Sequence, residues 1–112
     1  MKLLFAFVLA YSFASPSHIF NTSLTVTVRD ELGNTVTGAQ VQLFEKEEDY
    51  TKEVNAVEKA ESDAKGVVKF KKLKPIAYFI LCRKGDKDNT GGGERVSKLE
   101  DGKFNKITVV IQ

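Results

Sequence analysis

Apolar and polar residues alternate along several short stretches of this chain, and this is the period of a half-buried β-strand. The residues that the alternation turns inward are Leu24, Val26, Val28, Val41, Leu43, Val68, Phe70, Tyr78, Ile80, Cys82, Ile107, Val109 and Ile111. Between residues 78 and 83 both alternating sets are largely apolar, which is typical of a central strand covered on both faces. Turn signals that contain glycine, at residues 33–34 and 63–66, separate some of these stretches.

Residues 45–65 follow no single pattern. Good helix formers are abundant there, but Val57, Ala60 and Ala64 make a stripe that is too narrow to hold a helix firmly against a core. We expect a loop followed by a short edge strand near 57–62, because charged side chains discourage an edge from pairing with other chains. The choice between helix and strand for residues 50–62 stays open.

Six or seven short strands without a long helix predict an all-β fold, a six- to seven-stranded antiparallel sandwich of two sheets. A single twisted sheet would leave one apolar face in water. Phe70 and Tyr78 are the expected core anchors. Cys82 is the only cysteine, so the domain has to be stable without an internal disulfide.

The beginning of the chain has the three parts of a secretory signal peptide. Lys2 supplies the positive charge, residues 3–13 form the apolar segment, and Ala14 ends a small-x-small motif after which we expect cleavage. The apolar run is short for the ~30 Å hydrocarbon core of a membrane, so no stable span is expected after cleavage, with an uncleaved anchor as the alternative. The predicted organisation is a signal peptide over 1–14, an extension over 15–22 and a β-sandwich domain over 23–112. The protein is then exported, to the periplasm, the outer envelope or the medium.

Charge nearly balances over the 112 residues, with 17 basic and 15 acidic side chains and a formal net charge of +2. Nucleic-acid binding usually needs a concentrated basic stripe. The compact basic cluster of this chain comprises Lys69, Lys71, Lys72 and Lys74, and its position around a strand predicts that it includes side chains projecting into solvent. We therefore expect no nucleic-acid partner.

The sequence offers little for acid–base or nucleophilic catalysis. His18 is the only histidine and lies in the extension after the predicted signal peptide. Cys82 takes an inward strand position, where a thiol acts as a small apolar side chain rather than as a nucleophile. No catalytic residue is predicted and the expected function is non-enzymatic, with a small hydrolase of an unrecognised type as one alternative.

The loop from Gly85 to Glu94 is the one stretch that looks like a site. Asp86, Asp88 and Thr90 alternate like the first oxygen ligands of a calcium loop, although the distal bidentate glutamate of an EF-hand is absent. A flexible loop is the simpler interpretation, and a calcium-stabilised structural domain is a further alternative; no other cofactor is expected. Loops on a rigid scaffold often carry binding function. The predicted partner-binding residues are Asp86, Asp88, Asn89, Gly91, Gly92 and Gly93.

Two stretches carry a family pattern. Residues 28–43 read VRDELGNTVTGAQVQL, and residues 62–70 read SDAKGVVKF, followed by Leu73, Pro75, Tyr78 and Ile80. Together they resemble the carboxypeptidase regulatory-like domain, a transthyretin- or Cna-B-like sandwich common in exported bacterial proteins. The pattern of that family is V-x-D, a glycine and G-A-x-V-x-L, then T-D-x-x-G-x-F-x-F-x-x-L and G-x-Y-x-L.

The departures from this pattern leave its turn glycines in place. Thr35 stands where the family usually has proline, Ser62 replaces threonine, and Ile76-Ala77 stand where a glycine precedes the tyrosine. The resemblance implies a prealbumin/Cna-B-like fold and a role as an accessory or structural module. Together with the predicted export, it predicts a binding module whose partner is an envelope protein or a glycan.

Overall fold

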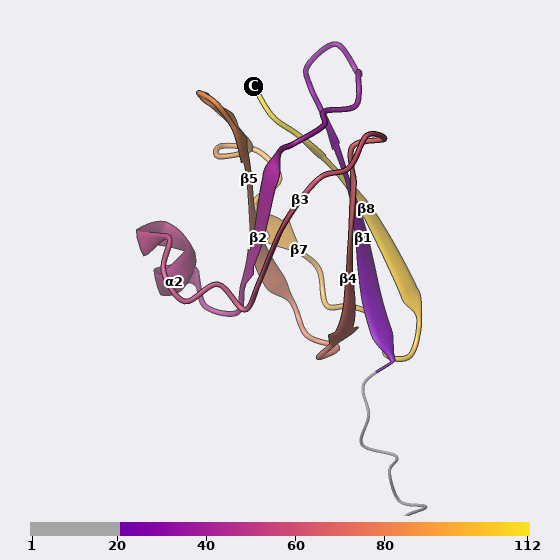
Figure 1. Ribbon diagram of the computed structural model, residues 1–112. Helices are drawn as coiled ribbons and strands as arrows, with labels where there is room; N and C mark the ends of the chain where they lie inside the picture. The colour runs from indigo at the N-terminus through magenta and orange to yellow at the C-terminus, as the bar shows by residue number, and fades with distance from the viewer. Residues whose placement is uncertain (1–20) are drawn as a thin grey trace, which may run out of the picture.

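A computed structural model describes residues 21–112, which form two sheets packed face to face (Figure 1). One sheet has the order β4-β1-β8; the other has the order β3-β2-β5-β6, with β7 also paired to β5. The elements are β1 (Thr22–Arg29), β2 (Gln40–Phe44), α2 (Glu47–Lys52), β3 (Glu58–Glu61), β4 (Val67–Leu73), β5 (Tyr78–Lys84), β6 (Lys87–Asp88), β7 (Arg95–Val96) and β8 (Phe104–Val110). The all-β two-sheet sandwich predicted from the alternation is confirmed.

The core lies between the two sheets and contains the residues that the alternation turns inward. All of the predicted inward residues are buried except Ile107, which is half-buried and packs against the core. Phe70 and Tyr78 belong to this cluster, as expected for anchors. The central position of β5 is also confirmed, since β2 pairs on one side of it and β6 and β7 on the other.

One pair of strands differs from the antiparallel arrangement that we expected. β1 and β8 run parallel, from Ser23 opposite Phe104 to Arg29 opposite Val110. Parallel neighbours need a crossover connection rather than a tight turn. Along the chain, β4 and all strands of the second sheet come between β1 and β8. The first and last strands of the described domain are therefore neighbours in one sheet.

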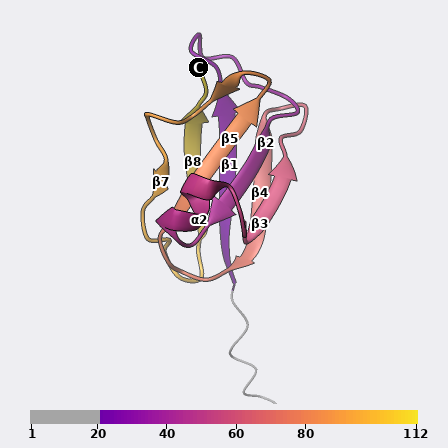
Figure 2. The ribbon, with the colours of Figure 1, turned by 90° about the vertical axis from the view of Figure 1, so that its left-hand side faces the viewer.

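The ambiguous segment contains a short helix followed by an edge strand. The expected strand near 57–62 is confirmed as β3 at the edge of its sheet, and the helix that stayed open is α2, which packs on the outer face of β2 and β5 (Figure 2). The stripe of Val57, Ala60 and Ala64 lies after this helix and does not hold it. Tyr50 holds it instead, because its ring lies 5.8 Å from that of Phe44 and 5.7 Å from that of Phe79. After α2, the carboxylate of Glu53 accepts two hydrogen bonds from the Arg83 guanidinium, at 2.8 and 2.9 Å.

Two aspartates close the turns of the family-like stretches. Asp30 accepts hydrogen bonds from the backbone N–H groups two and four residues further along, at 3.0 and 2.9 Å, and Asp63 does the same at 2.8 and 3.0 Å. These bonds lower the pKa of both carboxyl groups. Gly66 has a φ of 77°, and a Cβ there would lie 2.8 Å from the Cβ of Thr35. The second turn therefore needs a glycine.

The described residues begin inside the predicted extension. β1 begins at Thr22, one residue before the predicted start at 23. The predicted signal peptide, its cleavage after Ala14 and the candidate His18 lie outside the described residues. No helix within residues 21–112 is long and apolar enough to cross a membrane.

Candidate functional site

The predicted binding loop is partly built into the sheet. Residues 87–88 form β6, and the side chain of Asn89 turns inward with only 1% of its surface exposed. Its Oδ1 accepts a hydrogen bond from the backbone N–H of Cys82 at 2.9 Å, and its Nδ2 donates to the carbonyls of Ile80 at 2.9 Å and Gly93 at 3.2 Å. Asn89 thus holds the loop against β5. A partner could contact the exposed residues beside Asn89 but not its buried side chain.

The candidate calcium ligands Asp86 and Asp88 have different neighbours. The Oδ1 of Asp88 accepts hydrogen bonds from the backbone N–H of Thr90 at 3.0 Å and from its hydroxyl at 2.6 Å, and Oδ2 lies 4.0 Å from the Arg83 guanidinium. Asp86 lies at the end of the sandwich instead. Among residues 21–112, no group of three or more His, Cys, Asp or Glu side chains is arranged to hold a metal ion. Calcium binding through this loop stays a prediction.

Gly91, Gly92 and Gly93 are exposed, as a partner-binding loop requires. The backbone N–H of Gly91 donates to the carboxylate of Glu94 at 2.7 Å. Binding by these glycines also stays a prediction.

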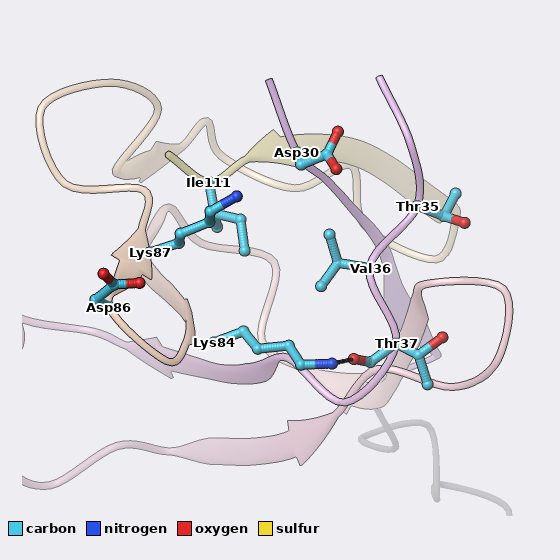
Figure 3. Close-up of a pocket in the computed structure, with 8 residues that line it drawn as sticks. All are labelled: Asp30, Thr35, Val36, Thr37, Lys84, Asp86, Lys87 and Ile111. Carbon is cyan, nitrogen blue, oxygen red and sulfur yellow. Dashed lines mark hydrogen bonds between the residues drawn. The ribbon is translucent and has the colours of Figure 1, made fainter. Parts of the chain in front are cut away.

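A pocket of about 410 Å³ opens at the end of the sandwich where Asp86 lies (Figure 3). Lys84 and Lys87 place their ammonium groups in it together with the carboxylates of Asp30 and Asp86. The Lys84 ammonium donates to the carbonyl of Thr37. Because positive and negative side chains alternate around this pocket, it favours neither an anionic nor a cationic ligand.

Cys82 behaves as the sequence predicted. It is fully buried in β5, and burial raises the pKa of its thiol to about 12. A thiol with so high a pKa is protonated at neutral pH and is a poor nucleophile.

The outer face of the β4-β1-β8 sheet carries charge of a single sign. β1, β4 and β8 contain Arg29, Lys69, Lys71, Lys72 and Lys106 and no acidic residue. Lys69 and Lys106 lie opposite Thr25 on its two sides, so the three side chains form one row across the sheet. The predicted lysine cluster is divided, because Lys74 instead pairs with Glu45 at 3.4 Å.

A pocket of about 350 Å³ lies on this face, and we call it the Phe104 pocket. It is lined by Asn21, Ser23, Lys69, Lys71, Lys72 and Phe104. The Phe104 side chain is 83% exposed. Ser23 is 5% exposed, and its buried hydroxyl has no hydrogen-bond partner among residues 21–112. Three lysines and an exposed ring thus line the same pocket as Ser23, whose unsatisfied buried hydroxyl is a polar group that calls for an explanation.

A β-bulge brings the lysines together. The register of β4 against β1 shifts between Phe70 and Leu73, and Lys72 has a φ of 58° there. As a result Lys71 and Lys72 are both exposed, whereas an unbroken strand would turn one of them inward. The left-handed conformation costs a lysine of order 1 kcal/mol. Bulges of this kind often re-aim side chains beside functional sites.

Part of this site could be recognised from the sequence. Lys69, Lys71 and Lys72 were recognised as a cluster, but their exposure was interpreted as simple solvation. Phe104 was missed, although the inward parity of Ile107 and Val109 already places residue 104 on the outer face. No local pattern could have shown that residues 69–72 and 104 come together, because β1 lies between them.

The sequence matches no protein-family model and no curated protein sequence. Solved structures are nevertheless similar. The backbone protein of the group B Streptococcus pilus 2b superposes with a TM-score of 0.61 at 15% identity, over 81% of this chain and 40% of that protein. The major pilin subunit BcpA of Bacillus cereus gives 0.54 at 19% identity, over 83% of this chain and 30% of that protein.

A third similar structure has nearly the same length as this chain. It is a Pseudomonas aeruginosa protein described as a candidate carbohydrate-binding protein, with a TM-score of 0.51 at 12% identity, over 90% of this chain and 95% of that protein. This chain spans less than half of either pilin structure. Identities this low show the fold alone. The chain therefore has the Cna-B/prealbumin-like β-sandwich fold that its two family-like stretches predicted.

Proposed function

We propose that this chain is an exported, non-enzymatic binding module that holds an acidic glycan on the outer face of the β4-β1-β8 sheet. The observation that carries the proposal is the Phe104 pocket, in which a strained bulge gathers three lysines around an exposed aromatic ring. Strain of this kind persists where the surrounding structure maintains it, often for function.

The chemistry of the pocket suits a sugar acid better than a neutral ligand. The apolar face of a sugar ring can pack on Phe104, as aromatic rings offer large apolar contact surfaces. Ammonium groups make charge-assisted hydrogen bonds to carboxylates, and Asn21 and Ser23 supply short polar groups at the pocket. The pilus proteins and the candidate carbohydrate-binding protein support a structural or binding role for this fold.

The proposal is tested with polygalacturonate as the acidic polymer and dextran as its neutral counterpart. We expect binding to polygalacturonate that weakens with salt, and a loss of roughly tenfold in affinity for F104A or for K71A. L32A and K59A are the matched controls, because Leu32 is 87% exposed and Lys59 lies on β3 in the other sheet.

A second variant separates binding from stability. K72G replaces a strained lysine by the residue that accepts a positive φ, so it should leave the protein as stable or more stable while it weakens polygalacturonate binding. Equal binding of K72G, F104A and the wild type would refute the proposed site. Binding to single-stranded DNA as tight as to polygalacturonate would instead indicate a nucleic-acid partner.

A further inference from the structure

β8 leaves one edge of its sheet open. It is the last strand in the order β4-β1-β8, and within residues 21–112 no strand pairs with its outer side. The carbonyl of Lys103 and the N–H of Ile111 bond to β1, at 3.1 and 2.9 Å. Because backbone groups alternate between the two sides of a strand, the odd-numbered residues of β8 face β1. The residues whose N–H and C=O groups face the open side are Phe104, Lys106, Thr108 and Val110.

The open side is bounded but accessible. Beyond its far end, Gln112 exchanges two hydrogen bonds with Asp88, at 3.0 and 3.3 Å, which closes the sandwich there. A groove of about 430 Å³ follows β8, and its other wall is formed by residues 93 and 95–100, which include β7. Proteins usually protect such edges with charges, prolines or bulges. β8 has no proline and a single charge, and residues 107–110 are all β-branched.

We propose that a second copy of this chain covers the edge. β8 of one protomer pairs antiparallel with β8 of its partner about a two-fold axis at Ile107, and the two three-stranded sheets become one continuous sheet of six strands. This interface uses the same residues on both protomers, as a closed two-fold dimer requires. The inference does not rest on the proposed glycan, although both use Phe104 and the dimer would join the two basic faces.

The side chains of β8 select this register. Only a pairing of even-numbered with even-numbered residues satisfies the open backbone groups. With the axis at Ile107, Phe104 faces the partner's Val110, and Lys106 faces the partner's Thr108, so all four open residues of each strand find a partner. A shift of the axis to Lys106 would place two lysines directly opposite each other, which is unfavourable.

The apolar pattern agrees with the same axis. Phe104 and Val110 are two of the large apolar residues that the described structure leaves exposed, at 83% and 45%. They lie on one face at opposite ends of β8, so each pairs with the other across the axis. On the inner face, half-buried Ile107 meets the partner's Ile107 in a non-hydrogen-bonded pair, where side chains approach most closely.

A charge exchange tests the register. The full chain, expressed with its own first segment and purified as the host processes it, should be a concentration-dependent dimer in sedimentation velocity. T108K places a lysine opposite the partner's Lys106 twice per dimer and should raise the dissociation constant roughly tenfold. K106E alone should leave the dimer in place, and K106E/T108K should restore it through opposite charges. T27K is the control, since Thr27 lies beside Thr108 in the same row on the central strand.

Hydrogen exchange gives a residue-specific measurement. The amides of Lys106, Thr108 and Val110 should become protected as the protein concentration rises. A monomer at all concentrations, or a dimer that responds equally to T27K and T108K, would overturn the proposal. Protection of these amides in a strict monomer would overturn it as well, because a second copy would then not be what covers the edge.

Discussion

Asn89 should be one of the most sensitive polar residues of the domain. Its amide fills the gap between β6 and β7 along β5, where it takes the place of a strand backbone. Oδ1 satisfies the N–H of Cys82 and Nδ2 satisfies the carbonyl of Ile80, each at 2.9 Å. N89A would leave both of these backbone groups buried without a partner.

The expected loss follows from the number of groups left unpaired. An unsatisfied buried backbone group costs about 1–3 kcal/mol, so the two groups that N89A leaves unpaired should reduce the free energy of unfolding by about 2–6 kcal/mol. That is a large part of the ~5–15 kcal/mol that stabilises an ordinary domain. T90A is the control, because it removes an exposed hydrogen bond of the adjacent residue and should cost about 1 kcal/mol or less.

N89D tests the direction in which stability changes with pH. A carboxylate still accepts from Cys82 but faces the Ile80 carbonyl without a proton to donate, so burial should raise the pKa of the new acid. Its folded-state pKa then lies above the unfolded value, and stability relative to the wild type should fall as pH rises from about 4 towards neutral. Urea unfolding followed by far-ultraviolet circular dichroism measures all three variants. A loss for N89A no larger than that for T90A would show that the hydrogen bonds of Asn89 do not support the loop.

The remaining predictions concern the core, the turns and the loop. F70A should cost about 3–5 kcal/mol, measured by urea unfolding against exposed F104A; a loss below about 1 kcal/mol would contradict the β4 register. The thiol of Cys82, with its pKa near 12, should react with a disulfide reagent at neutral pH only after unfolding, and rapid labelling of the folded protein would refute its burial. The pKa of Asp63 is lowered in the folded state, so its carboxylate stabilises the fold at pH values above the unfolded pKa near 3.8. In urea unfolding, the stability advantage of the wild type over D63N should therefore shrink as pH falls below about 4. A difference that stays constant with pH would contradict this role of the carboxylate. If the calcium loop binds, millimolar calcium raises the melting temperature of the wild type but not of D88N, whereas identical melting curves in calcium and chelator exclude the site.

The sandwich could be predicted because its signals are local. Leu24, Val26 and Val28 alternate with polar residues, and a pleated strand sends successive side chains to opposite faces. The turns at Asp30 and Asp63 were visible too, since each aspartate bonds to N–H groups within four residues. Helix α2 could not be decided in this way, because Tyr50 holds it through contacts with β2 and β5.

Candidate site residues were harder to place than core residues. Asn89 looked like an exposed loop residue, but its side chain bonds to a strand whose position depends on the whole fold. Lys71 and Lys72 look like one inward and one outward position until the bulge in β4 exposes both. Bulges arise from pairing with a second strand, so the sequence of β4 alone does not reveal this one.

Alternation along the chain is enough to assign strands, inward residues and the two-layer architecture, because each depends on the pleat of a single strand. Which strands become neighbours depends on the path of the whole chain. That path places β1 between β4 and β8, parallel to the latter, and so brings Phe104 to the lysines of β4. It also leaves β8 at an open edge. Both proposed surfaces are therefore properties of the tertiary structure, because no local pattern in the sequence brings their residues together.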